Sequence, residues 1–271
     1  MTGVIRHPVI LVISVFDAQL MSKENSAMVS QPKIDYINRL IDESLSEGDD
    51  TIELKGKFIG DEGVEALVQS TKLDGIEDLD LSNNNITWRG AVQLFKCDRF
   101  RNLKRLYIND NNIADKGALA LAEAPFLDGL SVLDIRFNNI GVSGGVAIAS
   151  CARFSKLQVL SFQENQVGDQ TLITLAKNPN FGNVRKLNFY RTGISFKGIK
   201  VLAKSKVLKK VKHLNIGRNY LHPDSAKALA ETKTLTNVET LLMIENYLGD
   251  EGVKIIMDSK SFIKLKTFRV L

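Results

Sequence analysis

A stretch of twelve residues that recurs at a constant spacing of 27 residues constrains the fold of this chain more than any other feature. One copy reads LDLSNNNITWRG, residues 79–90. The other copies, all in the same phase, are residues 52–63, 106–117, 133–144, 160–171, 187–198, 214–225 and 241–252, with a final half-copy from Leu265. A constant period of this length predicts a stack of similar structural units, each packed against its neighbours in the sequence.

Each unit begins with a pattern that predicts a short strand. Leu79 and Leu81 are two residues apart and point to one face of such a strand, while Asp80 and Ser82 point to the other. A strand this short cannot bury its apolar face alone, so the copies are expected to lie side by side in a parallel sheet. Apolar residues at helical spacing within 90–100 predict a helix that covers this sheet.

The consensus of the units is L-x-x-L-x-L-x-x-N-x-I, followed four positions later by a small residue. Over residues 49–271 this pattern resembles the leucine-rich repeat family, and more narrowly its ribonuclease-inhibitor-like subclass. The resemblance implies an α/β fold: a leucine-rich repeat solenoid, or horseshoe, with a parallel concave β-sheet and convex helices. It also implies that the concave face binds another protein.

One column of asparagines is expected to be structural, because it falls where the chain leaves the sheet and its backbone groups need partners. A side-chain amide offers donors and an acceptor together, so the column should form a ladder between neighbouring turns. Thr192 keeps a hydroxyl at this position, whereas Lys57 can only donate and fits an end unit that is open to water. The column consists of Asn84, Asn111, Asn138, Asn165, Asn219 and Asn246.

The chain is expected to divide into three parts. Residues 1–31 form a flexible N-terminal arm or targeting-like extension, because residues 8–16 (PVILVISVF) are apolar but too few to span a bilayer. Whether residues 1–20 are a signal peptide or an upstream extension stays open. Residues 32–48 should form a capping helix, and residues 49–271 an array of about eight repeats plus a terminal strand. That strand leaves an uncapped edge through which a homodimer could form.

The solvent-facing side of the strands is the best candidate for a binding surface, because the core does not dictate its residues. It is acidic in the first copies and turns aromatic and basic farther along the chain. Tyrosine and arginine are among the residues that most often anchor protein interfaces. The residues predicted to contact a partner on this concave face are Tyr107, Arg136, Phe137, Tyr190, Arg191, His213, Arg218, Tyr220, Tyr247, Asp78, Asp80, Asp110 and Asp134.

Two other features compete with this surface. Trp88, the only tryptophan, lies between strand and helix, where it could anchor a partner or be partly buried against the next loop. Residues 197–212 carry seven lysines that could meet nucleic acid or anionic lipid. The lysines alternate with apolar core positions and no aromatic residue is interleaved, which favours a solvated convex helix. Nucleic acid and membrane are therefore not expected as partners.

The sequence offers no catalytic or metal-binding motif. His7, His213 and His222 are the only histidines and lie in different settings, and neither H-E-x-x-H nor C-x-x-C occurs. Cys97 and Cys151 lie two units apart, which is too far for a disulfide or a shared metal site, and are expected to be small buried hydrophobes. We therefore expect a protein that is not an enzyme and has no cofactor.

The function expected from these observations is a non-catalytic protein–protein interaction module, such as an intracellular adaptor or a bacterial effector. The alternatives are a regulator of the Ran GTPase-activating type, using Arg89 or Arg191, or a basic-surface nucleic-acid or lipid binder. The net charge of +5 allows an acidic partner without requiring nucleic acid. Two cysteines in 271 residues indicate a reducing compartment, so we expect the cytoplasm, with secretion, including delivery into a host cell, as the alternative.

Overall fold

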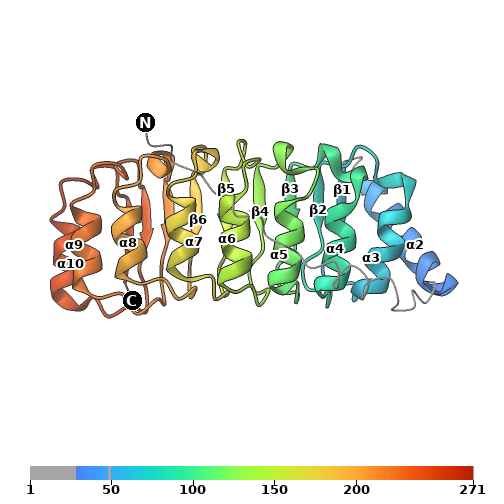
Figure 1. Cartoon of the computed structure of the whole chain (residues 1–271), viewed down its shortest axis with the longest axis horizontal. Helices are drawn as coiled ribbons and strands as arrows, with labels where there is room; N and C mark the ends of the chain where they lie inside the picture. Colours follow the sequence, from blue (N-terminus) through green and yellow to red (C-terminus); the bar gives the residue numbers. More distant parts are fainter. Residues whose placement is uncertain (1–28, 48–49, 271) are drawn as a thin grey trace, which may run out of the picture.

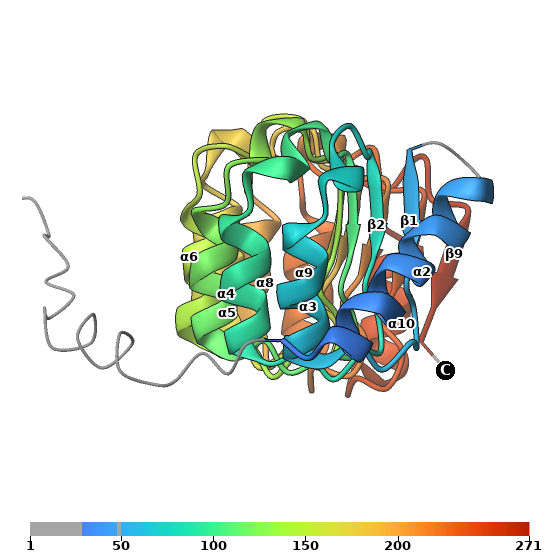
Figure 2. The ribbon, with the colours of Figure 1, turned by 90° about the vertical axis from the view of Figure 1, so that its right-hand side faces the viewer.

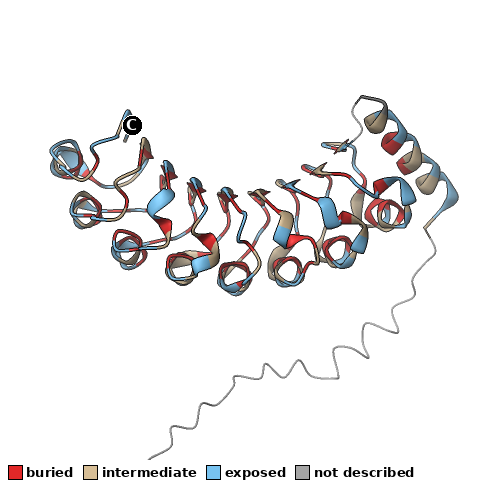
Figure 3. Ribbon diagram, turned by 90° about the horizontal axis from the view of Figure 1, so that it is seen from above, coloured by how far each residue is buried: buried red, intermediate tan, exposed pale blue. Residues whose placement is uncertain are grey.

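The computed structural model describes residues 29–47 and 50–270. These residues form one curved stack, in which strands line the inner face and helices form the outer face (Figures 1 and 3). Almost all of the expected N-terminal arm lies outside the described residues, so its targeting role stays a prediction.

The strands are short and parallel, and they follow one another across the sheet in sequence order. Each pairs in register with the next, so that Leu79 lies opposite Leu106, which in turn lies opposite Leu133. This in-register stack of nine strands in the described part of the chain confirms the predicted solenoid. The strands are β1 (Thr51–Glu53), β2 (Asp78–Asp80), β3 (Arg105–Tyr107), β4 (Val132–Asp134), β5 (Val159–Ser161), β6 (Lys186–Asn188), β7 (His213–Asn215), β8 (Thr240–Leu242) and β9 (Thr267–Arg269).

The helices cover the outer side of the sheet. The α-helices are α2 (Gln31–Glu47), α3 (Gly60–Gln69), α4 (Trp88–Lys96), α5 (Ala114–Ala122), α6 (Val142–Ser150), α7 (Gly168–Leu175), α8 (Phe196–Leu202), α9 (Pro223–Ala230) and α10 (Gly249–Met257). Short 3-10 helices precede several strands: η1 (Thr71–Leu73), η2 (Asp98–Asn102), η3 (Leu127–Gly129), η4 (Pro179–Phe181) and η5 (Leu208–Lys210). Figure 2 shows the two layers, with α3 to α6 on one side and β1, β2 and β9 on the other.

The core lies between these layers and is built from equivalent positions of successive units. Leu79 and Leu81 of the second unit are buried in the same hydrophobic cluster as Leu94 and Phe95 of α4. Burial of each such leucine contributes about 1.5–3 kcal/mol, so the apolar columns stabilise the stack as a whole. The large side chains continue from unit to unit, as Phe162 packs against Phe189 with ring centres 5.3 Å apart.

The predicted asparagine ladder is present. Asn138 is fully buried, and its Nδ2 donates to the carbonyl oxygens of Ile108 (2.8 Å), Ile135 (3.1 Å) and Arg136 (3.0 Å). Its backbone N–H donates to Oδ1 of Asn165 in the next unit at 3.1 Å. The Ile108 carbonyl also accepts from Asn111 at 3.0 Å and the Ile135 carbonyl from Asn165 at 2.9 Å, so these buried carbonyls link successive members of the column.

Two units have another residue in place of the asparagine, and other groups make their hydrogen bonds. The Thr192 hydroxyl donates to the Phe189 carbonyl at 2.9 Å, and the Thr192 N–H donates to Oδ1 of Asn219 at 2.9 Å. Lys57 is exposed in the first unit, where the hydroxyl of Tyr36 from α2 donates to the Lys57 carbonyl at 2.9 Å. Helix α2 lies across this end of the stack and buries Ile37 and Ile41 against the first unit (Figure 2).

Successive units alternate in how their helices begin, a feature that the 27-residue consensus did not predict. Asp115 of the third unit accepts hydrogen bonds from the N–H groups of Gly141 (2.7 Å) and Gly144 (3.0 Å) in the fourth. A Cβ on Gly144 would lie 2.7 Å from the same carboxylate oxygen, so the position requires glycine. Asp61 and Asp169 hold Thr87 and Ser195 in the same way, so in this part of the chain every second unit caps the following helix.

Candidate interaction surface on the concave sheet

The third residue after each of the strands β1 to β8 has a left-handed backbone. Phe137, Arg191 and Arg218 have φ values of 52°, 51° and 55°, a region that costs a side-chain-bearing residue roughly 1–2 kcal/mol. The asparagine ladder directly behind them fixes the turn and offsets this cost. The position of these residues in the repeat, and not their own backbone preference, therefore presents these predicted contact residues to solvent.

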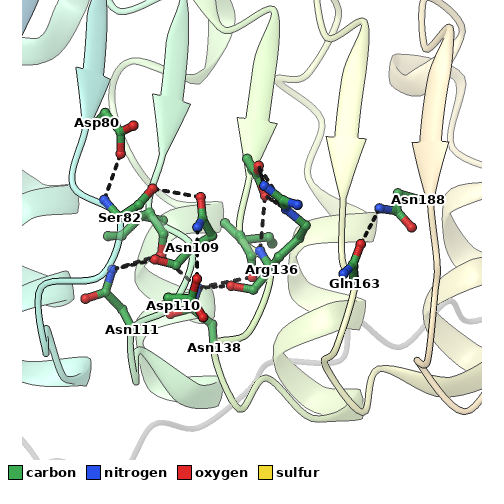
Figure 4. A network of polar contacts seen from close by, with 12 residues as sticks. Asp80, Ser82, Asn109, Asp110, Asn111, Arg136, Asn138, Gln163 and Asn188 are labelled. Carbon is green, nitrogen blue, oxygen red and sulfur yellow. Dashed lines mark hydrogen bonds and ion pairs between the residues drawn. The ribbon is translucent and has the colours of Figure 1, made fainter. Parts of the chain in front are cut away.

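The acidic side chains predicted for the first part of the face already have partners within the chain. Asp78 forms an ion pair with Arg105 of the next strand. Oδ1 of Asp80 accepts the N–H of Ser82 at 2.8 Å (Figure 4). Arg136 holds both carboxylate oxygens of Asp134, with Nε–Oδ1 and Nη2–Oδ2 distances of 2.8 and 2.7 Å.

Neutral side chains add further bonds on this face, in one group near Asn109 and in a separate pair formed by Gln163 and Asn188 (Figure 4). The Ser82 hydroxyl donates to Oδ1 of Asn109 at 2.7 Å, and Nδ2 of Asn109 donates to Asp110 at 3.3 Å. Tyr107 lies half-buried in this region, and burial raises the pKa of its phenol. A partner that bound here would have to compete with bonds that the surface already makes.

The C-terminal part of the face contains a hollow of about 440 Å³. It opens over strands β6 to β8, where the short side chains of Asn188 and Asn215 leave room beside Leu242. His213 borders the hollow and contacts the Thr240 hydroxyl through Nδ1 at 3.1 Å. The lining residues are Lys186, Leu187, Asn188, His213, Leu214, Asn215, Thr240 and Leu242.

Tyr190 crosses the sheet beside this hollow. Its hydroxyl contacts Oε1 of Glu245 at 3.1 Å, and Gly217 of the unit between them leaves space for the ring. A Cβ on Gly217 would lie 2.9 Å from Cδ2 of Tyr190 and 2.9 Å from Cγ1 of Ile244. Tyr190 is therefore half-buried and held in place by its neighbours. It is not the freely exposed anchor that its sequence position suggested.

Three aromatic side chains form an exposed cluster in the turns that follow β7 and β8. Tyr220 and Tyr247 stack with ring centres 5.7 Å apart and an interplanar angle of 24°, and 65% and 59% of their surfaces are exposed. The His222 ring lies 5.5 Å from that of Tyr247. We call Tyr220, His222 and Tyr247 the aromatic rim cluster.

The part of the concave face that is predicted to be aromatic and basic also contains two glutamates, Glu164 and Glu245. Nη1 of Arg191 lies 2.6 Å from Glu164, and Nε of Arg218 lies 3.3 Å from Glu245. All four residues occupy the same position in four consecutive units, so their proximity could have been read from the period. Selecting residues by type alone, as tyrosine and arginine, missed their acidic neighbours.

The remaining sequence candidates lie away from the hollow. Trp88 begins α4 on the rim, with Nζ of Lys116 4.4 Å from its ring centre. The lysine-rich segment 197–212 is divided among α8, η5 and the residue before β7, so it is not one continuous helical stripe. Cys97 and Cys151 are both free thiols, and burial raises the pKa of each.

Across residues 29–47 and 50–270, no group of three histidine, cysteine, aspartate or glutamate side chains is arranged to hold a metal ion. In the same part of the chain, every helix is too short or too polar to cross a membrane.

Comparison with known proteins gives both a sequence match and structural likenesses. A family model described as Leucine Rich repeat matches residues 76–95, 101–122 and 130–149. No curated protein matches the chain. The fold is similar to the plant peptide hormone receptor RGFR1 in complex with RGF2, with a TM-score of 0.40 and 14% identity over 73% of this chain. The likeness spans 32% of that receptor chain, so this protein corresponds to about a third of it.

Two further solved structures show a similar level of likeness. A chain of the yeast Rad7 and Elc1 complex has a TM-score of 0.43 and 12% identity over 80% of this chain and 73% of its own. A protein from Bacteroides fragilis has a TM-score of 0.46 and 16% identity over 87% of this chain and 82% of its own.

Proposed function

We propose that this leucine-rich repeat chain is a non-catalytic protein-interaction module that contacts its partner with the C-terminal part of its concave face. The observation that carries the proposal is the aromatic rim cluster, where two stacked tyrosines stay largely exposed in the turns after β7 and β8, the strands that line the hollow with Leu242. Tyrosine is enriched where interfaces are energetically strongest, because a large ring is buried with little loss of side-chain freedom.

The two parts of the concave face differ in how much of their polar surface is already satisfied. Asp80, Asp134 and Arg136 bond within the chain, and a partner gains little from groups whose bonds it must first break. At the other end, the aromatic rings and Leu242 expose apolar area whose burial is favourable. The hollow and the rim cluster together supply an apolar centre bordered by charged residues, the usual anatomy of an interface.

The test compares two tyrosine substitutions with a matched substitution at the opposite end. Tyr220→Ala with Tyr247→Ala removes the rim cluster, whereas Phe58→Ala removes an aromatic residue that is 71% exposed at the equivalent position of the first unit. Phe58 also shares a positive φ with Tyr220 (53° and 59°), which controls for backbone effects of alanine. Affinity capture from lysate with wild type and both variants then shows which captured proteins depend on the cluster.

The expected result is that proteins captured by wild type are retained by Phe58→Ala and lost with the double variant. Capture that is unaffected by the double variant would refute the assignment of the surface. Melting curves of all three proteins should overlap closely, because the substituted side chains lie mostly in solvent.

The GTPase-regulating alternative has less support. Arg191 is paired with Glu164, and Arg89 lies over the Trp88 ring with Cζ 4.8 Å from its centre, so both guanidinium groups already have partners. A GTP-hydrolysis assay with any captured GTPase separates the two functions, because an interaction module leaves the hydrolysis rate unchanged.

Self-association through β9 also stays a prediction. This strand ends the described sheet, and its outer edge offers backbone groups to another strand. Sedimentation velocity over a range of concentrations tests it. A constant monomer mass at every concentration would exclude the homodimer.

A further inference from the structure

The residues that immediately precede the strands form a second surface, on the rim of the stack where the chain enters the sheet. Their backbones are joined in series: Ser131 N–H donates to Lys104 C=O (2.7 Å), Gln158 to Ser131 (2.8 Å) and Arg185 to Gln158 (2.8 Å). We call this row, which runs through Lys104, Ser131, Gln158 and Arg185, the strand-start rim. Its positions repeat at the strand spacing of about 4.8 Å, so Lys104 and Arg185 begin about 14 Å apart.

A hollow of about 590 Å³ lies on this rim. It exists because Ser131 and Gly129 are small, while longer side chains stand at both ends of the row. Gly129 fits closely beneath it, since a Cβ there would lie 3.0 Å from the Leu103 carbonyl oxygen. The lining residues are Arg101, Asn102, Lys104, Gly129, Ser131, Lys156, Gln158, Asn183 and Arg185.

The lining is cationic and contains neither a carboxylate nor an apolar side chain. Among the described residues, Lys156 and Arg185 have no ion-pair or hydrogen-bond partner for their side chains. The pKa of Asp128 is lowered mainly by its hydrogen bond from Arg153, and the charge of Lys156 adds to this from a distance. Lys104 is paired with Glu77 at 2.5 Å, and Arg101 has only a long exposed contact with Asp98 at 3.5 Å. The cationic side chains of the hollow therefore outnumber the carboxylates that pair with them within the protein.

We infer that this hollow binds a compact ligand that carries several phosphate groups. Arginine and lysine form charge-assisted bonds to phosphate oxygens, and the neutral side chains of Asn102 and Gln158 can donate to the remaining oxygens. A spacing of about 14 Å between Lys104 and Arg185 suits several phosphates better than one. No aromatic side chain lines the hollow, so it lacks the stacking platform that single-stranded nucleic acids use.

This site is separate from the proposed protein-binding face. The strand-start rim lies at the beginning of the strands, and the aromatic rim cluster lies in the turns that follow them. The two proposals can therefore fail independently of each other.

The test measures binding of inorganic tripolyphosphate by titration calorimetry, at low and at physiological salt. Lys156→Ala with Arg185→Ala removes the two uncompensated charges. Lys204→Ala with Lys206→Ala removes two exposed lysines that lie outside the hollow, so both double variants carry the same net charge. Ser131→Leu fills the hollow without changing any charge. Circular dichroism checks that each variant is folded.

We expect wild type to bind tripolyphosphate, more weakly as salt increases. Lys156→Ala with Arg185→Ala should weaken binding about tenfold or more, since each lost charge removes a charge-assisted bond. Ser131→Leu should also weaken it, whereas the control pair should change it little. Absence of wild-type binding at low salt, equal loss in both double variants, or undiminished binding by Ser131→Leu would each overturn the inference.

The source of the phosphates is distinguished in a second arm. Free inositol 1,4,5-trisphosphate represents a soluble ligand, and phosphatidylcholine vesicles that display the corresponding phosphoinositide represent a lipid headgroup. Binding to the free compound as tightly as to the vesicles identifies a soluble ligand. Much tighter binding to vesicles, lost in Lys156→Ala with Arg185→Ala, identifies the lipid.

Discussion

The phenol of Tyr190 lies 3.1 Å from Oε1 of Glu245, although a whole repeat separates the two residues. The contact is possible because the intervening unit has Gly217 where other units carry a larger side chain. Glu245 also pairs with Arg218, so one carboxylate connects three consecutive units on the concave face. The geometry of the proposed binding surface thus depends on a residue with no side chain.

We predict that Gly217→Ala displaces the Tyr190 ring. The new Cβ would lie 2.9 Å from Tyr190 Cδ2 and 3.0 Å from the Ile244 carbonyl oxygen. Both distances are shorter than a Cβ normally keeps from other heavy atoms. The ring resonances of Tyr190 in an NMR spectrum should shift strongly. Tyr190→Phe, which removes only the hydroxyl, should keep the ring in place and cost about 0.5–1.5 kcal/mol at most. Unchanged Tyr190 resonances in Gly217→Ala would contradict the proposed packing.

Leu187→Ala should destabilise the protein substantially. Leu187 is buried at the centre of β6, between Leu160 and Leu214 of the neighbouring strands. Removing its methyl groups leaves a cavity that costs about 2–5 kcal/mol, measurable by urea unfolding. Lys186→Ala, on the exposed side of the same strand, is the control and should stay within about 0.5 kcal/mol of wild type. Similar losses in both variants would show that the faces of the strand are misassigned.

Asn138→Ala should break the ladder at one unit. The carbonyl oxygens of Ile108 and Ile135 keep the amides of Asn111 and Asn165, whereas the buried N–H of Ile113 loses its acceptor, Oδ1 of Asn138. A buried unpaired group of this kind costs about 1–3 kcal/mol. Asn112→Ala is the matched control, because Asn112 is exposed and its side chain bonds only to that of Asn139. Unfolding in urea should show a loss in the first variant and almost none in the second. Equal losses of stability in the two variants would contradict a role of the ladder in holding successive units together.

Acid should loosen the last strand of the sheet. The Glu239 carboxylate accepts hydrogen bonds from Lys212 (2.9 Å) and Lys266 (2.7 Å), which lower its pKa from 4.5 to about 2. Because the folded pKa is the lower one, this stabilisation is complete above about pH 4.5 and is lost as the pH falls toward 2.

Amide exchange in β9, corrected for its intrinsic pH dependence, measures this effect. Protection of the Thr267 amide, which donates to the Glu239 carbonyl, should fall across that interval in wild type. Glu239→Gln should show weaker protection at neutral pH and a flatter response to acid. Identical pH profiles for the two proteins would rule out a role for this carboxylate.

The sequence predicts the stack well because its determinants repeat. Leu79, Asn84 and their equivalents hold the same role in each copy, so one interpretation serves all units and every copy checks the others. The ladder was predictable for the same reason, including the substitution of Thr192, whose hydroxyl still reaches the Phe189 carbonyl.

The candidate site was less predictable because it depends on differences between units. The period places Tyr190, Gly217 and Ile244 in one column, but it does not say that the tyrosine ring turns along the stack toward Glu245. That direction follows from the room left by the glycine and from the position of the carboxylate. The residues of the strand-start rim were likewise missed, because a hollow between cations arises only when small residues separate them in space.

The alternating aspartate caps restrict how such an array can change in length. Asp61, Asp115 and Asp169 each cap the helix of the following unit. Removing two adjacent units keeps this alternation, so a unit with the aspartate still precedes each unit whose helix it caps. Removing the third unit alone would instead place Val142 and Gly144 next to the helix that begins at Trp88, which has no carboxylate at that position. Over this region, insertion or deletion of two units preserves every helix start, whereas insertion or deletion of a single unit disrupts one.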